Sequence, residues 1–470
     1  MNEELKFKMH SVYGQILTER KLLTAWQQVK ENGGSGGIDG VTLDKYEAKL
    51  SGNINDLLQR LRAKEYQPTS VRRVYISKKN SKKMRPLGIP TIEDRIVQQA
   101  VMNVLYPKFE GEIFHKWSCG YREGLGAQRV LQIILWNLET GYNHIYDCDI
   151  RGFFDNIPHK KLMKVLTKYI ADGTTLDMIW KWLKAGYMED KIQYETTSGT
   201  PQGGVISPLL ANAYLNELDW ELEKEGIRFV RYADDFLLFA KSEEEIKRAG
   251  TIANRVIEEL GLEVAMEKTK FVDFNKDDFD FLGFTFGHWR EKRDESGKYF
   301  LVGPTKASLK DFKQKIKDKT RKSLTFSKEA WFQRVNPIIR GKVNYYLIIH
   351  KAIEANKQHG QKSRCFIKHI GRYLHDIDAY TRKRLRVAMI HKNPSQRKGY
   401  LMSNKWNNEF FARAGLVPGN WYFYNRMWGY DIEVYIQRII ERSQKKSKQA
   451  RRPYTKSRLI KLKAAHAYRN

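Results

Sequence analysis

A pair of adjacent aspartates in the middle of the chain most constrains its fold. Asp234 and Asp235 lie between two short stretches, residues 228–231 and 236–240, that are rich in aromatic, aliphatic and β-branched side chains. This pattern predicts a strand, a tight turn and a second strand. Two neighbouring carboxylates repel each other, and a divalent cation relieves that repulsion. An ordinary acidic hairpin tip is the alternative interpretation, and other segments decide between the two.

The chain carries a large excess of positive charge. Its 470 residues include 84 Lys and Arg against 54 Asp and Glu, which gives a formal net charge of +30. Solubility alone needs a net charge of only about 2–8 in a small domain. The excess therefore predicts a polyanionic partner.

The cysteines and the hydropathy pattern limit the cellular setting. Cys119, Cys148 and Cys365 are scattered and show no paired spacing, so neither a disulfide framework nor a structural zinc site is expected. No stretch approaches about 18 consecutive apolar residues, and residues 1–10 carry charges in place of an apolar signal core. We expect a protein of a reducing, cytoplasmic compartment with no membrane partner.

Patterns of mixed helix and strand give way to helix after residue 302. The first part predicts an α+β unit around an antiparallel sheet, and the length of the chain allows two or three units. We divide the chain into residues 1–302, 303–390 and 391–470. Its last charge run, residues 442–469, is either a helix that lies on nucleic acid or a solvated extension. Helices are expected over residues 10–30, 43–61, 91–106, 125–140, 160–185 and 243–260, and a basic strand pair over 70–90.

A second acidic cluster contains the candidate partner of the aspartate pair. Asp149 ends a predicted strand and is framed by Ile145 and Ile150. Two-metal phosphoryl transfer requires carboxylates from separate segments that converge on two ions about 4 Å apart. Asp149 with Asp234 and Asp235 meets this requirement if their strands are neighbours. One ion would then activate a 3′-hydroxyl, and the other would bind the triphosphate and the leaving pyrophosphate.

Ordered motifs along the chain resemble those of a bacterial group II intron-encoded reverse transcriptase/maturase. The matching segments are residues 37–41 (N-terminal extension), 74–90 (fingers), 149–157 (motif A), 199–208 (motif B), 232–235 (motif C), 260–262 with 267–270 (the motif that follows), 281–284 (primer-grip turn) and 339–346 (thumb, or X, domain). So many segments in the family's order make a chance match implausible.

The resemblance implies a right-hand polymerase. Residues 1–302 would form the N-terminal extension, fingers and palm, residues 303–390 a helical thumb, and residues 391–470 a basic nucleic-acid-binding domain. The implied activity is RNA-directed DNA polymerisation with two Mg²⁺ ions, for which Mn²⁺ can substitute. The implied partners are deoxynucleoside triphosphates, an RNA template such as group II intron RNA, and a DNA or RNA primer. No C-x-x-C or paired-His nuclease motif occurs near the C-terminus, so an endonuclease domain is not expected.

The resemblance also assigns the catalytic residues. They are Asp149, Asp234 and Asp235, and Ile150 joins them as a metal-binding and nucleotide-binding residue.

Further nucleotide-binding residues come from the fingers and from motifs A and B. Lys78, Lys79 and Arg85 would clamp the triphosphate, unless they only form a solvated basic hairpin; an arginine can do so through two parallel bonds. Gln202 would hydrogen-bond the sugar or base, unless its loop is only a structural turn. Phe154 would pack under the sugar and clash with a 2′-hydroxyl, unless it is a core residue.

Lys268 or Lys270 would neutralise or protonate the leaving pyrophosphate, although a surface role is equally compatible with the position of either lysine. In the thumb, Arg340, Lys342 and Tyr345 would contact nucleic acid. Residues 119–125 lack the proline and the second arginine of the family's pattern, which puts that loop's nucleic-acid contacts in doubt. Two other roles stay open: an RNA-binding splicing maturase with little polymerase activity, and a domesticated reverse transcriptase that acts in phage defence or DNA repair.

Overall fold

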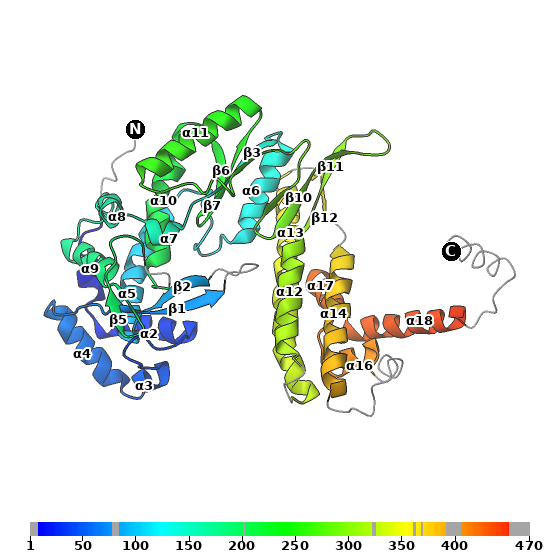
Figure 1. Ribbon diagram of the computed structural model, residues 1–470, viewed down its shortest axis with the longest axis horizontal. Coiled ribbons are helices and arrows are strands. Elements are labelled where there is room, and N and C mark those ends of the chain that lie inside the picture. The colour runs from blue at the N-terminus through cyan, green and yellow to red at the C-terminus, as the bar shows by residue number, and fades with distance from the viewer. Residues whose placement is uncertain are drawn as a thin grey trace. The chain divides into compact units, whose positions relative to one another are not determined.

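Two compact units make up the chain (Figure 1). The first comprises Met1–Val302 with Lys351–Phe366, and the second Gly303–His350 with Ile367–Asn470. The sequence-based division into three domains stays a prediction. The computed structural model describes residues 8–77, 84–200, 203–321, 326–360, 363–367, 370–391 and 406–450.

A four-stranded antiparallel sheet lies at the centre of the first unit (Figure 1). In spatial order its strands are β6 (Arg228–Tyr232), β7 (Asp235–Ala240), β3 (His144–Asp149) and β8 (Lys270–Asp273). After its first residue β7 is apolar and buried throughout, as expected for a strand that is covered on both faces. Helix α11 (Glu243–Glu259) packs against β3 and β7, and α6 (Ala127–Glu139) packs against β6.

A second sheet of the first unit contains the predicted basic strand pair. Strands β1 (Val71–Ser77) and β2 (Met84–Ile89) are antiparallel, which confirms the pair. Two short strands that the sequence did not reveal, β4 (Tyr187–Glu189) and β5 (Ile192–Tyr194), extend this sheet, and β4 runs parallel to β1. Their two-residue turn was missed because Asp190 and Lys191 adopt positive φ (48° and 67°) without the glycine that normally marks such a turn.

The other helices of this unit surround the sheets. They are α1 (Val12–Ile16), α2 (Glu19–Asn32), α3 (Leu43–Glu47), α4 (Leu50–Arg62), α5 (Ile92–Lys108), the π-helix η1 (Phe109–Ile113), α7 (Phe153–Asn156), α8 (His159–Leu166), α9 (Gly173–Lys184) and α10 (Ser207–Lys224). Two expected helices are each broken in two by a capping residue. Thr18 caps α2, and Asp172 caps α9, so residues 10–30 and 160–185 each form two helices.

A third sheet follows the central one along the chain. Its order is β12 (Cys365–Ile367), β11 (Lys298–Pro304), β10 (Phe284–Glu291) and β9 (Phe279–Phe281). The turn between β9 and β10, at the predicted primer-grip segment, uses positive φ at Leu282 (45°) and Gly283 (76°).

Helices dominate the second unit, as the sequence predicts. They are α12 (Lys306–Lys319), α13 (Lys328–Gln358, whose last eight residues belong to the first unit), α14 (Ile370–His391), α16 (Asn408–Arg413), α17 (Gly419–Trp428) and α18 (Ile432–Ala450). Helix α14 packs against α12 and α17. Buried Asp378 of α14 accepts hydrogen bonds from the backbone N–H groups of Gly419 (2.6 Å) and Asn420 (3.1 Å), which fixes the start of α17. Among the described residues, no helix is long and apolar enough to cross a membrane.

Candidate active site

The structure brings the three predicted catalytic aspartates together. Asp149 is the last residue of β3 and lies directly opposite Asp235, the first residue of β7, in the antiparallel register. Asp234 occupies the turn between β6 and β7, because Tyr232 pairs with Asp235 across the hairpin. Ala233 adopts a left-handed φ of 60°, which a non-glycine residue adopts only when its surroundings hold it there.

A buried ion pair between Arg231 and Asp219 supports this turn. Arg231 and Asp219 of α10 are 1% and 0% exposed, and the Arg231 Nε donates to Asp219 Oδ1 over 2.7 Å. The Arg231 Nη1 also donates to the Ala233 carbonyl (2.9 Å) and to Asn212 Oδ1 (3.0 Å). A buried ion pair is stable only when its remaining hydrogen-bond donors also have partners. Here one of these bonds, from Arg231 to the Ala233 carbonyl, holds Ala233 in its left-handed conformation.

A loop packs against the other side of the turn. Asn212 donates to the Gly120 carbonyl over 2.7 Å. A side chain at Gly120 would place its Cβ 2.3 Å from the Ala233 nitrogen, so the close approach requires glycine. In the same loop Arg122 forms two 2.8 Å bonds with Glu110 and is almost fully buried. This arginine supports the loop from inside, and its guanidinium is unavailable to nucleic acid.

Burial and mutual repulsion change the ionisation of the aspartates. Burial, and then the charges of Asp234 and Asp149, raise the pKa of Asp235 from 3.8 to about 7. Burial also raises the pKa of Asp234, with a further contribution from Asp149, whereas Arg85 and Lys268 act in the opposite direction. Although Asp235 is exposed on one side, the surrounding protein mass restricts its hydration.

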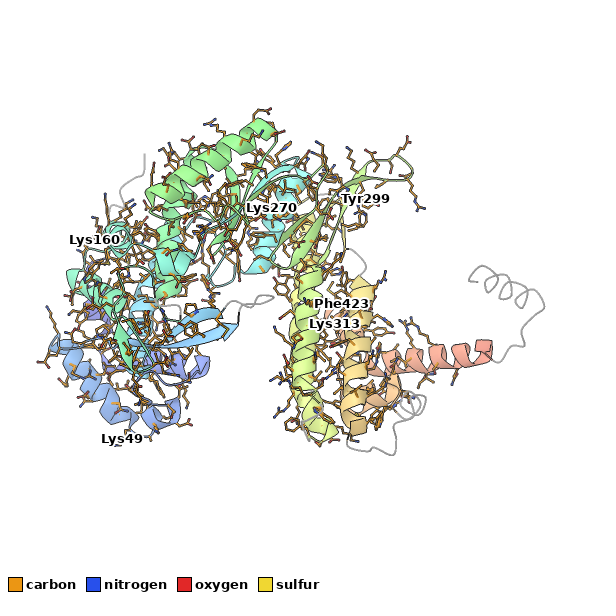
Figure 2. All side chains as sticks on the ribbon, in the orientation of Figure 1. Lys49, Lys160, Lys270, Tyr299, Lys313 and Phe423 are labelled. Atoms are coloured by element: carbon orange, nitrogen blue, oxygen red, sulfur yellow. The ribbon has the colours of Figure 1, made fainter. Side chains whose placement is uncertain are left out.

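Lys268 lies at the predicted catalytic carboxylates. Its Nζ donates to Asp149 Oδ1 over 2.7 Å, and this bond raises the pKa of the ammonium. The contact follows from the backbone: Ile150 forms an isolated antiparallel bridge with Val264, and the Ala265 N–H donates to the Asp149 carbonyl (2.8 Å). Lys270, the alternative lysine, is labelled in Figure 2 and begins β8 directly opposite Asp147.

The donor set fits magnesium. Mg²⁺ prefers oxygen ligands and is held in such sites by one or two carboxylates together with substrate phosphates and water. Asp234 and Asp235 both have a raised pKa, and a bound cation would favour their ionised forms. Among the described residues, however, no group of three or more His, Cys, Asp or Glu side chains is arranged to hold a metal ion by itself, and the Lys268 ammonium lies 2.7 Å from Asp149 Oδ1.

The predicted nucleotide-binding residues fall into three groups. Lys78, Lys79 and Gln202 lie outside the described residues. Arg85 is exposed on β2 and lies close enough to Asp234 to lower its pKa. The side chain of Ile150 is buried, which leaves its main chain for a ligand.

Phe154 is part of the hydrophobic core and also borders the site. Its ring meets that of Tyr121 edge to face at 6.1 Å, and Tyr121 is near enough to Asp234 for that charge to raise its pKa, after burial. Gly199, with φ +88°, allows the motif B loop to approach so closely that a Cβ would lie 2.9 Å from the Phe154 carbonyl. A backbone bond from Thr200 to that carbonyl (2.8 Å) joins motifs A and B. The two interpretations of Phe154 are therefore compatible.

The thumb residues lie on α13 of the second unit. Arg340 is exposed, whereas Lys342 and Tyr345 are half-buried. The Lys342 ammonium donates to Ser308 of α12 and lies 5.2 Å from the Tyr346 ring. Their contacts with nucleic acid stay predictions.

Substitution of Asp235 tests the electrostatics of the site. The folded-state pKa of about 7 exceeds the ordinary value of 3.8, so the wild-type protein loses stability as pH rises through this interval. Asp235→Asn removes the charge and is expected to raise the midpoint of thermal unfolding at pH 8 in EDTA by about 1–2 °C, a modest effect because water reaches the side chain. No difference is expected near pH 4. Thermal melts between pH 4 and 8 measure this, and added Mg²⁺ should reduce the gap; a less stable variant at pH 8 in EDTA would contradict it.

The geometry thus places carboxylates at the ends of two adjacent antiparallel strands. Residues 76–286 match the family described as reverse transcriptase (RNA-dependent DNA polymerase). Protein YkfC of Escherichia coli (strain K12) is 33% identical over 286 residues, which cover 53% of this chain and 74% of YkfC. The group II intron-encoded protein LtrA of Lactococcus lactis subsp. cremoris is 37% identical over 239 residues, 50% of this chain but only 39% of LtrA.

The chain therefore belongs to the reverse transcriptase family, and its homologues include group II intron-encoded proteins. Its enzymatic class is RNA-directed DNA polymerase, and the mixed helix-and-sheet fold is that of a right-hand polymerase. Members of the family use divalent metal ions. A solved telomerase from Candida albicans aligns with 80% of this chain and 67% of its own at 13% identity, but its TM-score of 0.39 is too low to support an argument.

Residues that the sequence did not reveal complete the site. Arg231, Asp219, Asn212 and Gly120 hold the turn, and Tyr121 borders it. A signal for Tyr121 was its place beside a glycine in a motif-like loop. No signal in the sequence indicated that Asp219 is buried beside Arg231, because an acidic residue in a helix is normally exposed to solvent.

Proposed function

We propose that Asp149, Asp234 and Asp235 bind two Mg²⁺ ions and catalyse DNA synthesis on an RNA template. The observation that supports this most directly is the pairing of Asp149 with Asp235 next to the Asp234 turn. When bound, the ions would lower the pKa of the primer 3′-hydroxyl and neutralise charge on the triphosphate.

The protein residues contribute positioning and charge. Arg85 on β2 carries a positive charge that would attract phosphate oxygens. An arginine can bind two of these oxygens through parallel hydrogen bonds. Lys268 donates to Asp149 Oδ1, so a cation bound at that oxygen would displace its ammonium, which could then donate a proton to the leaving pyrophosphate. The Phe154 and Tyr121 rings form the apolar wall that would exclude a 2′-hydroxyl.

A template comparison tests the proposal. A DNA primer annealed to an RNA template should be extended in Mg²⁺, and EDTA should stop the reaction completely. The same primer on a DNA template of equal sequence is the matched control. Extension on DNA but not on RNA, or synthesis that persists in EDTA, would contradict the assignment.

We further propose that the RNA partner is a structured group II intron RNA whose splicing the protein assists. The similarity to LtrA supports this, and so does the basic composition of the chain. Contacts with phosphates make affinity fall steeply with salt, so binding is compared at matched salt with an unrelated folded RNA of the same length. Equal affinity for the two RNAs would leave polymerisation in place and remove the splicing role.

A further inference from the structure

The second unit carries an exposed pair of aromatic rings that the polymerase chemistry does not use. Trp428 is 64% exposed and Tyr424 38% exposed, and they lie one helical turn apart on α17. Their rings stack, with centroids 5.4 Å apart and 29° between their planes. Large rings held together in water mark a surface where a ligand can gain contact area.

The framework behind the two rings is rigid. Gly429 ends α17 in a left-handed conformation, and the carbonyl of Tyr430 then accepts bonds from Trp421 Nε1 (2.9 Å) and Asn425 Nδ2 (3.1 Å). On the inner side of the helix, buried Phe423, labelled in Figure 2, contacts the Trp428 ring with centroids 6.3 Å apart. Rings held in place before binding lose little entropy when a ligand arrives.

Positive charge adjoins the rings. The Tyr430 ring lies 6.4 Å from that of Tyr424, and the Arg438 guanidinium lies over Tyr430 at 4.9 Å. Arg442 follows one turn later on α18, and both arginines are exposed. Neither forms an ion pair with a described carboxylate, whereas the nearby Glu433 already pairs with Arg413 at 3.4 Å.

We propose that Tyr424, Trp428 and Tyr430, with Arg438 and Arg442, form a stacking platform for single-stranded nucleic acid. Every base has a π-face, so stacking on aromatic rings tolerates any sequence, and arginines beside the rings neutralise the phosphates. Single-stranded nucleic acid would stack its bases on the exposed rings and bind its phosphates to the two arginines. An apolar protein partner would cover the rings but leave the arginines without an anionic partner. The platform lies outside residues 76–286, and its binding does not depend on the proposed catalytic roles.

Fluorescence anisotropy of the full chain with labelled 20-mers of single-stranded RNA and DNA tests the platform. The buffer contains EDTA and no nucleotides, so synthesis does not contribute and a failure of the proposed polymerase chemistry leaves the readout unchanged. Trp428→Ala is expected to weaken binding of both oligonucleotides about fivefold or more, and Trp428→Phe to retain most of the affinity. The matched control is Trp136→Ala on α6, which removes a 41% exposed tryptophan from the first unit and should bind as wild type does.

A salt series separates stacking from charge. Arg438→Gln with Arg442→Gln should make the slope of log affinity against log salt less steep by about 1.4, or ~0.7 for each phosphate contact with a single strand, whereas Trp428→Ala should leave the slope unchanged. Binding of Trp428→Ala within twofold of wild type for both oligonucleotides would overturn the proposal. Altered self-association of Trp428→Ala in sedimentation, with unchanged oligonucleotide binding, would overturn it in favour of a protein interface.

Discussion

Asp234→Asn and Asp235→Asn are each expected to abolish primer extension, with a loss of about 10³-fold or more. Asparagine keeps the size and polarity of the side chain but removes the charge that a cation requires. The affinity for RNA should stay within about twofold of wild type, because neither aspartate supplies positive charge to phosphates. Single-turnover extension on an RNA template measures the first quantity, and RNA binding in EDTA measures the second.

Asp277→Asn is the matched control, because it removes an exposed aspartate from a loop of the same unit and should leave extension unchanged. Loss of activity through unfolding is distinguishable here. The raised pKa of Asp235 means that the folded protein tolerates its charge poorly, so Asp235→Asn should be inactive yet at least as stable as wild type. Extension at the wild-type rate in either active-site variant would remove the catalytic assignment.

The sequence contained enough to predict the hairpin and the strand that holds Asp149. The apolar flanks of Asp234 and Asp235 have the length and β-branched content of strands, and in the structure they are β6 and β7. That β3 is the neighbour of β7 was an inference from chemistry, since only converging carboxylates bind two ions, and the register confirms that the strands are adjacent.

Contacts between distant segments were beyond a local reading of the sequence. The partner of Lys268 is Asp149, 119 positions away, and the bridge between Ile150 and Val264 that brings them together has no signature in composition. The parallel pairing of β1 with β4 likewise depends on tertiary structure, because three-residue strands carry too little pattern to detect. The two bonds from Arg122 to Glu110, which bury this arginine, likewise join segments whose pairing has no local signal in the sequence.

Arg231 offers the second large effect. Arg231→Met leaves Asp219 charged and buried without its partner, and breaking such a pair costs about 3–5 kcal/mol. It also removes the donor to the Ala233 carbonyl, so the left-handed turn that carries Asp234 loses its support. We expect a lower midpoint of thermal unfolding and a large loss of primer extension. The matched control is Arg255→Met, whose exposed guanidinium lies 3.7 Å from Glu221 and should contribute less than about 1 kcal/mol.

A double variant separates stability from positioning. Arg231→Met with Asp219→Leu replaces the buried pair by apolar side chains, and such replacements are often neutral or stabilising. Stability should therefore recover towards wild type, but extension should not, because Ala233 and Asn212 still lack their donor. Recovery of both would show that Arg231 acts only on stability. Recovery of stability alone, with Mg²⁺ affinity weakened in a titration of the double variant, would identify Arg231 as the residue that positions the catalytic turn.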